Sequence, residues 1–212
     1  MRKRAIILFF LLVPVTSVLF HSCICPPCPR QQFRDFTHKS LSLMNLDNSG
    51  ARPVESELLQ LNKNAFGIRL FLEAEFSPAL THQSRGGSFL IQSAYAVSCW
   101  CLPEFVYTAK ENILSITILT LNDFDSQHPA NSDVTDLFRV ARSFSTIENF
   151  VANRPHSFEV DIELEFWQEQ ELTIDLLLMF PPSANNKQQF EVQVALSDGR
   201  ILKQQTTEIE LL

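Results

Sequence analysis

Four of the five cysteines stand in two close pairs, Cys25 with Cys28 in CPPC and Cys99 with Cys101 in CWC. Thiols at these spacings can form disulfides, hold zinc as four thiolates, or work as a redox couple. Pairing between neighbours is unfavourable, because two prolines stiffen the first segment and the second would close a very tight ring. The spacing therefore favours disulfides between the first pair and the second, with zinc and redox chemistry as the alternatives.

The fifth cysteine, Cys23, follows an apolar segment and has a different expected chemistry. Residues 1–4 (MRKR) carry three positive charges, and residues 5–20 carry none. A basic start, an apolar run that is short for a membrane span, and the small residue Ser22 before the cut are typical of a secretory signal. A signal that ends in a small residue and cysteine resembles the lipobox of bacterial lipoproteins. This resemblance implies cleavage after residue 22 and a fatty-acyl anchor such as palmitate on Cys23. The alternatives are a plain cleaved signal with Cys23 in a disulfide, and an uncleaved membrane anchor.

Export bears on the other four cysteines. An oxidising compartment favours disulfides over zinc thiolates, and an even number of remaining cysteines suits pairing. A redox thiol needs a helix N-terminus to lower its pKa, whereas the prolines of CPPC extend the chain close to the anchor. We expect a stapled tether over residues 23–33, with no metal and no cofactor.

Four carboxylates alternate with apolar residues in the C-terminal third, at Glu159, Asp161, Glu163 and Glu165. Residues two apart on a strand lie about 6.5–7 Å apart, which is near the separation of the carboxylates in an inverting glycosidase. Catalytic carboxylates need different surroundings to separate their pKa values, and four equivalent acids on a wet face lack that difference. The pattern predicts a solvated strand face, with cation binding and catalysis as the alternatives.

The remaining polar residues predict little further chemistry. The turn at residues 47–50 (DNSG) and the pair Asp123 and Asp125 match no calcium loop, so we expect ordinary Asx turns there. The histidines lack metal-ligand spacing, and the sequence contains no nucleophile elbow, phosphate loop or glycine-rich dinucleotide turn.

The elements that must position these residues are mostly strands. In residues 66–76 (FGIRLFLEAEF) apolar side chains alternate with charged ones, which indicates a half-buried strand. Residues 158–166 alternate in the same way, and residues 112–121 are apolar on both faces, which favours a central strand. The Asp198-Gly199 step predicts a hairpin between two further strands.

Only two short helices are predicted after the signal. One covers residues 132–140 with Ser132 as its cap, and the other covers residues 145–151 with a capping box from Ser145 to Glu148. Several strands and few helices predict an all-β fold, an antiparallel β-sandwich of generally immunoglobulin-like architecture.

The expected domain organisation is a signal peptide over residues 1–22, the Pro/Cys-rich tether over residues 23–33, and one β-sandwich domain over residues 34–212. Segments spread along the chain, among them CPPCP, LMNLDNSG, AFGIRLFLE, IQSAYAVSC and the final FEVQVALSDGR, together resemble an uncharacterised family of bacterial envelope lipoproteins with a domain of unknown function. The resemblance implies an envelope address and a single domain, and it carries over no catalytic residue.

The net charge of the chain limits the classes of molecule that it is expected to bind. Without Arg2, Lys3 and Arg4 the net charge falls from −7 to −10, which disfavours nucleic acid. We expect an exported outer-membrane lipoprotein that faces the periplasm or the cell surface, touches the membrane through its lipid, and binds or scaffolds an envelope protein or glycan. The alternative is an envelope hydrolase or carbohydrate-acting enzyme that uses the acidic face. The ligand, the oligomeric state and the membrane leaflet are not predicted.

Overall fold

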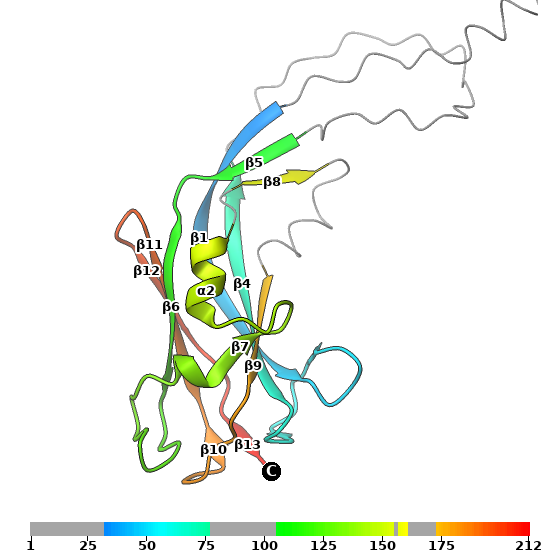
Figure 1. Ribbon diagram of the computed structural model, residues 1–212, viewed down its shortest axis with the longest axis vertical. Coiled ribbons are helices and arrows are strands. Elements are labelled where there is room, and N and C mark those ends of the chain that lie inside the picture. The colour runs from blue at the N-terminus through cyan, green and yellow to red at the C-terminus, as the bar shows by residue number, and fades with distance from the viewer. Residues whose placement is uncertain (1–31, 77–104, 155–156, 161–172) are drawn as a thin grey trace, which may run out of the picture.

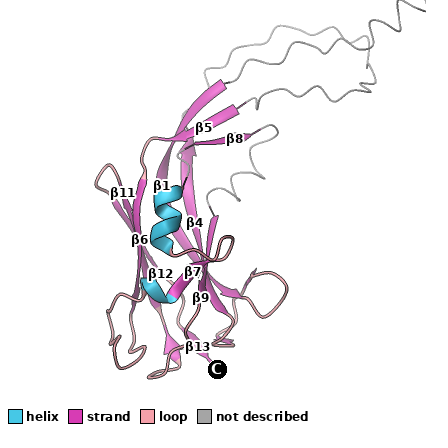
Figure 2. Cartoon of the chain, in the orientation of Figure 1, coloured by secondary structure: helices cyan, strands magenta, loops and turns pink. Residues whose placement is uncertain are grey.

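The computed structural model describes residues 32–76, 105–154, 157–160 and 173–212. Strands dominate these ranges, and one α-helix, α2 (Ile147–Asn153), lies beside them (Figures 1 and 2). A large sheet and a smaller sheet contribute side chains to one shared hydrophobic core. The prediction of an all-β sandwich is confirmed.

The large sheet has the strand order β7-β9-β4-β1-β5-β8. Its strands are β1 (Gln32–Asp47), β4 (Phe66–Phe76), β5 (Phe105–Ala109), β7 (Phe138–Val140), β8 (Ser157–Val160) and β9 (Thr173–Leu178), and β2 (Val54–Glu55) pairs with the end of β1. Neighbours are antiparallel except β1 and β5, which run parallel. A bulge between His38 and Ser40 divides β1 into two registers against β4.

The smaller sheet has the order β12-β11-β6, and a third short sheet has the order β10-β13-β3. The strands are β3 (Gln60–Leu61), β6 (Ile113–Thr120), β10 (Lys187–Gln188), β11 (Phe190–Leu196), β12 (Ile201–Gln205) and β13 (Ile209–Leu211). The predicted hairpin is confirmed, because β11 and β12 pair antiparallel across a turn in which Gly199 has a φ of 88°. A positive φ costs glycine little, which explains its place in this turn.

The core forms where the inward faces of the two main sheets meet. Alternate residues of β4 from Phe66 to Leu72 are fully buried, as the sequence pattern predicted. Phe190 of β11 lies at the centre, with its ring centroid 5.6 Å from those of Phe66 and Phe138. Each such side chain contributes about 1.5–3 kcal/mol by leaving water, so these contacts hold the two sheets together.

The helix predicted over residues 132–140 is wrong. This segment holds only a 3-10 turn, η1 (Thr135–Leu137), followed directly by β7. Its polar groups bond to β6 instead: the Thr120 amide donates to the Ser132 carbonyl, and the Ile118 amide donates to the Thr135 hydroxyl. A tertiary demand for hydrogen bonds thus overrides the local helix signal.

The second predicted helix exists but begins later than expected. Its cap is Thr146, whose hydroxyl accepts from the Asn149 amide at 3.2 Å, whereas Ser145 lies 2.7 Å from the Ser143 hydroxyl. Within the described ranges, no helix is long and apolar enough to cross a membrane.

The segment over residues 112–121 is a strand but not a central one, because β6 lies at an edge of the smaller sheet. Ile116 and Ile118 are buried in the core, whereas Leu114 is 61% exposed, so the strand is not buried on both faces. Helix α2 packs against β6, and Asp133 forms a bridge with Leu119.

Candidate functional site

Nearly all residues singled out from the sequence lie outside the described ranges. They are Cys23, Cys25, Cys28, Cys99, Cys101, Asp161, Glu163 and Glu165. Glu159 belongs to β8, where its backbone lies opposite Val106 of β5. Lipidation, disulfide pairing and the acidic face therefore stay predictions.

The oxygen-rich turns are structural, as expected. The Asp47 carboxylate accepts from the Ser49 amide at 2.8 Å, and Asp125 accepts from the Gln127 and His128 amides at 2.8 Å each. These are Asx-type bonds that close the turns. Among the described residues, no group of three or more His, Cys, Asp or Glu side chains could hold a metal ion.

A groove of about 780 Å³ lies on the outer face of the large sheet. Its floor consists of two rows of directly paired residues across β1, β4 and β9. One row holds Met44, Arg69 and Asp175, and the other holds Ser42, Phe71 and Thr173. Cross-strand neighbours on one face lie about 4.5–5.5 Å apart, so each row presents a continuous strip of side chains to the groove.

Arg69 is fixed in this floor by two carboxylates. Its Nε and Nη2 atoms donate to the two oxygens of Asp175 at 2.7 and 2.8 Å, and Nη1 donates to Glu55 at 2.8 Å. The hydrogen bonds to Asp175, followed in size by the opposing effect of burial, leave the pKa of Arg69 above its ordinary value. The planar guanidinium is therefore held rigidly beside the groove.

The remaining lining comes from the segment after β7 and from α2. Val140, Ala141 and Arg142 contribute one part, and Phe150 and Arg154 contribute another. The Arg154 guanidinium carbon lies 5.5 Å from the centroid of the Phe150 ring, which is within the range of a cation–π contact. The groove thus combines apolar surface with hydroxyl, carboxylate and guanidinium groups, the composition expected of a ligand site.

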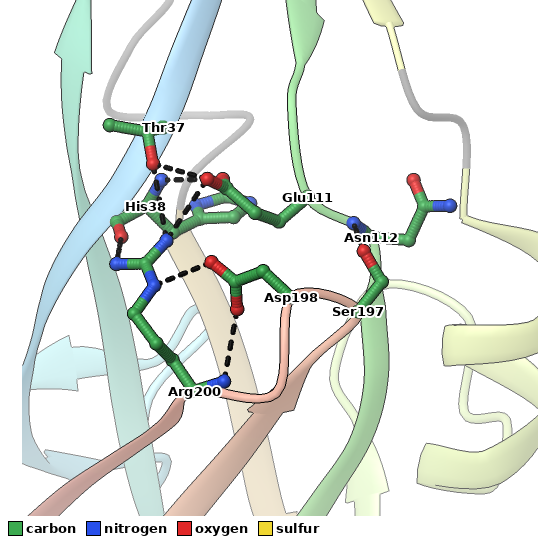
Figure 3. Close-up of polar contacts among 7 residues, drawn as sticks. All are labelled: Thr37, His38, Glu111, Asn112, Ser197, Asp198 and Arg200. Carbon is green, nitrogen blue, oxygen red and sulfur yellow. Dashed lines mark hydrogen bonds and ion pairs between the residues drawn. The ribbon is translucent and has the colours of Figure 1, made fainter.

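A second polar cluster gathers side chains from β1, the β5–β6 turn and the β11–β12 turn (Figure 3). The buried Glu111 carboxylate accepts from the Thr37 hydroxyl at 2.5 Å and pairs with Arg200 at 3.0 Å. Arg200 also pairs with Asp198 at 2.6 Å and donates to the His38 carbonyl at 2.7 Å. The cluster ties the bulge of β1 to the β5–β6 and β11–β12 turns.

His38 joins this cluster through its backbone amide and carbonyl, and its buried ring lies near enough to interact electrostatically with Glu111 and Arg200. The residue is 3% exposed, and Nδ1 has no hydrogen-bond partner in the part of the chain that the structure describes. Burial, then Arg154 and Arg200, lower the pKa of His38, and Glu111 partly opposes them. The Glu111 carboxylate bonds to the Thr37 hydroxyl and the His38 backbone amide, so no hydroxyl–imidazole–carboxylate relay is built here.

Only part of these sites has a signal in the sequence. The alternation in residues 66–76 places Arg69 on the outward face of its strand, but nothing local identifies Asp175 as its partner. Asp175 is the one charged residue of TIDLLL and could likewise be assigned to the outward face of its strand. The sheet order is still needed to know that Asp175 lies opposite Arg69.

The groove and the cluster lie within the region shared with other proteins, apart from Thr37. Residues 38–207 match the family described as "Domain of unknown function (DUF5034)". No curated protein and no solved structure matches the chain. Since the family match covers most of the chain, the protein belongs to the DUF5034 family.

Proposed function

We propose that this protein is a binding module of the bacterial cell envelope, anchored in the outer membrane by a lipid on Cys23. The basic start, the short apolar segment and the Ser22–Cys23 step support the anchor. Acyl chains contribute about 0.8 kcal/mol per buried methylene, which makes an anchor of several chains nearly permanent.

The groove on the outer face of the large sheet carries the proposal of binding. Its volume of about 780 Å³ falls within the roughly 300–1,000 Å³ of small-ligand sites. Its polar groups are held in place before any ligand arrives, because Arg69 is clamped by Asp175 and Glu55. A clamped guanidinium in an ion pair suits recognition better than acid–base chemistry, which needs a group that gives up its proton near neutral pH.

The anchor is tested by substituting Cys23→Ser in a host that processes lipoproteins. We expect the parent to carry an acylated N-terminus and to fractionate with the outer membrane, and the variant to lose both properties. Equal N-terminal masses and equal fractionation of the two proteins would refute the anchor.

The groove is tested with a photo-crosslinking side chain placed at Met44, and at Ser115 on the smaller sheet as the control. Both positions are exposed. We expect an envelope component to attach at position 44 and not at 115, and to disappear when Thr173→Arg fills the groove. The same adducts from both positions would show that the groove does not select a ligand.

A further inference from the structure

The edge strands of the two main sheets differ in whether their outward backbone groups are hydrogen-bonded by other parts of the chain. At the β7 edge, backbone groups are bonded by local structure: the Phe138 amide donates to the Thr135 carbonyl, and the Arg139 side chain donates to the Phe138 carbonyl at 2.7 Å. The Val140 amide donates to Ser145 at 3.1 Å. This edge has no backbone groups left to offer another strand.

The β6 edge is closed along its C-terminal half. The Val134 amide donates to the Ile118 carbonyl at 2.9 Å, and the Asn131 amide donates to the Thr120 carbonyl at 2.6 Å. These bonds complete the pattern in which Ile118 and Thr120 also donate to the same loop. Such coverage prevents unwanted pairing of strands.

Among the described residues, no backbone hydrogen bond covers the outward edge of β12, although β12 lies close to β1 of the large sheet. Within the described ranges, β12 pairs with β11 alone. The Leu196 amide donates to Arg200 and the Thr206 amide donates to Phe190, each at 2.9 Å. Antiparallel bonding alternates, so Leu202 and Gln204 bond to β11, whereas the N–H and C=O groups of the alternate residues point away. These outward residues are Ile201, Lys203 and Gln205, and all three are exposed.

We propose that this edge binds an extended peptide segment of a partner protein, which adds a strand to the smaller sheet. The surface is distinct from the groove, so the proposal goes beyond the function proposed above. Main-chain bonds supply affinity in this recognition mode, and alternate side chains supply specificity. The outward N–H and C=O groups of these three alternate residues offer regularly spaced donors and acceptors to such a segment.

The side chains of β12 indicate the chemistry of the segment. Lys203, the middle residue, makes no ion pair among the described residues, and its charge acts on Glu191 of β11 only without direct contact, so a carboxylate opposite it would find a complementary charge. On the inward side, the partly buried Leu202 packs against the core. We infer a segment with an acidic residue on one face and apolar residues on the other.

A second copy of this chain fits the edge poorly. Two β12 strands that pair antiparallel over their full length would place Lys203 opposite Lys203 of the other copy. Like charges directly opposite each other destabilise a strand pair. The edge is therefore suited to a different chain that carries the opposite charge.

The probe is a fluorescein-labelled peptide, SVTVEVTS, in which a central glutamate shares one face with threonines and valines form the other face. The matched control is SVTVKVTS. With the full-length protein in detergent, we expect fluorescence anisotropy to show saturable binding of the first peptide and about three- to tenfold weaker binding of the second. Thr173→Arg in the groove should change neither affinity.

Three substitutions at one position separate charge from backbone. Lys203→Glu should reverse the peptide preference, and Lys203→Thr should remove it. Lys203→Pro should weaken both peptides more than tenfold, because it removes an outward N–H without breaking a bond to β11. If the proline variant fails to fold, the charge reversal decides alone.

Several results would overturn the proposal. They are the absence of saturable binding by either peptide, an unchanged preference in Lys203→Glu, and equal binding by a folded Lys203→Pro variant. Sedimentation that shows a wild-type dimer abolished by Lys203→Pro would assign the edge to a second copy instead.

Discussion

Arg69 and Arg200 each join two carboxylates, yet the most buried of the four acids stands beside Arg200. Beside Arg69, the side chains of Glu55 and Asp175 are 44% and 20% exposed, and the groove lies alongside. Beside Arg200, the side chain of Asp198 is 34% exposed, whereas that of Glu111 is only 11% exposed. An arginine with two carboxylates thus lines a groove in one place and joins a strand bulge to two turns in the other.

The exposure of a carboxylate determines how much stability is lost when its partner is removed. A buried carboxylate has lost its water and depends on its protein partners, so loss of one partner is costly. An exposed carboxylate regains water when its partner is removed. Substitutions should therefore affect stability at Arg200 and binding at Arg69.

The largest expected effect follows from Arg200→Met. This change leaves the Glu111 carboxylate with two uncharged donors, the Thr37 hydroxyl and the His38 amide. We expect the free energy of unfolding to fall by about 2–3 kcal/mol, below the full value for a buried pair because Arg200 itself is partly exposed. Urea denaturation of the wild type and the variant measures this difference in the free energy of unfolding.

The matched control is the double variant Arg200→Met with Glu111→Gln, which removes the stranded charge. It should regain about half of the lost stability, since a neutral amide costs less to bury. No recovery in the double variant would show that packing, rather than charge, dominates this cluster.

Acid should act on the same cluster through His38. The unfolded side chain takes up a proton near its ordinary pKa of 6.5, whereas burial together with Arg154 and Arg200 lowers the pKa in the folded protein against the opposing effect of Glu111. Below pH 6.5 the unfolded state therefore binds the proton more readily, and stability falls as the pH drops toward the folded pKa.

The measurement is the melting temperature at several pH values between about 5 and 7.5, compared with that of His38→Leu. We expect the decline of the wild type to be steeper than that of the variant. Carboxylates with lowered pKa values, such as Asp198, lose their stabilising effect only at more acidic pH. Parallel curves for the two proteins would contradict the assignment to His38.

A smaller effect is expected at the groove. Arg69→Met should cost about 0.5–1 kcal/mol, because the acids it leaves are partly exposed. The same variant should lose crosslinking from position 44. A stability loss equal to that of Arg200→Met would erase the distinction between the two clusters.

The smallest effect is expected at the predicted acidic face. If its carboxylates are solvated, Glu163→Gln should change the free energy of unfolding by no more than about 0.5 kcal/mol and leave any envelope phenotype intact. Thermal melting and a complementation assay measure the two quantities. Loss of phenotype at an unchanged melting temperature would instead favour catalysis or cation binding there, since removal of a general acid or base costs about 10²–10⁴-fold in rate.

Local patterns predicted the fold better than the sites. Alternation identified the buried face of β4, and the Asp198-Gly199 step located the β11–β12 hairpin, because both signals lie within a few residues. Neither signal states which strands become neighbours. The parallel pairing of β1 with β5 therefore had no local signature.

Long-range contacts are the reason that the sites were missed. Arg69 and Asp175 are 106 positions apart, and the amide of His38 is 73 positions from the carboxylate that it bonds. The helix error at residues 132–140 has the same origin, because that segment is recruited to the edge of β6. Pairing across the sheet, which sequence periodicity does not encode, decides all three cases.

The length and position of β1 have a mechanical consequence. This strand spans sixteen residues, lies inside the large sheet and begins at Gln32, where the preceding chain would deliver any pull from an anchor. Tension along the strand would slide it past β4 and β5 and load many transverse hydrogen bonds at once, rather than peeling them open singly. A domain attached in this way should resist unfolding under tension from its N-terminus far better than under tension that peels off the edge strand β12.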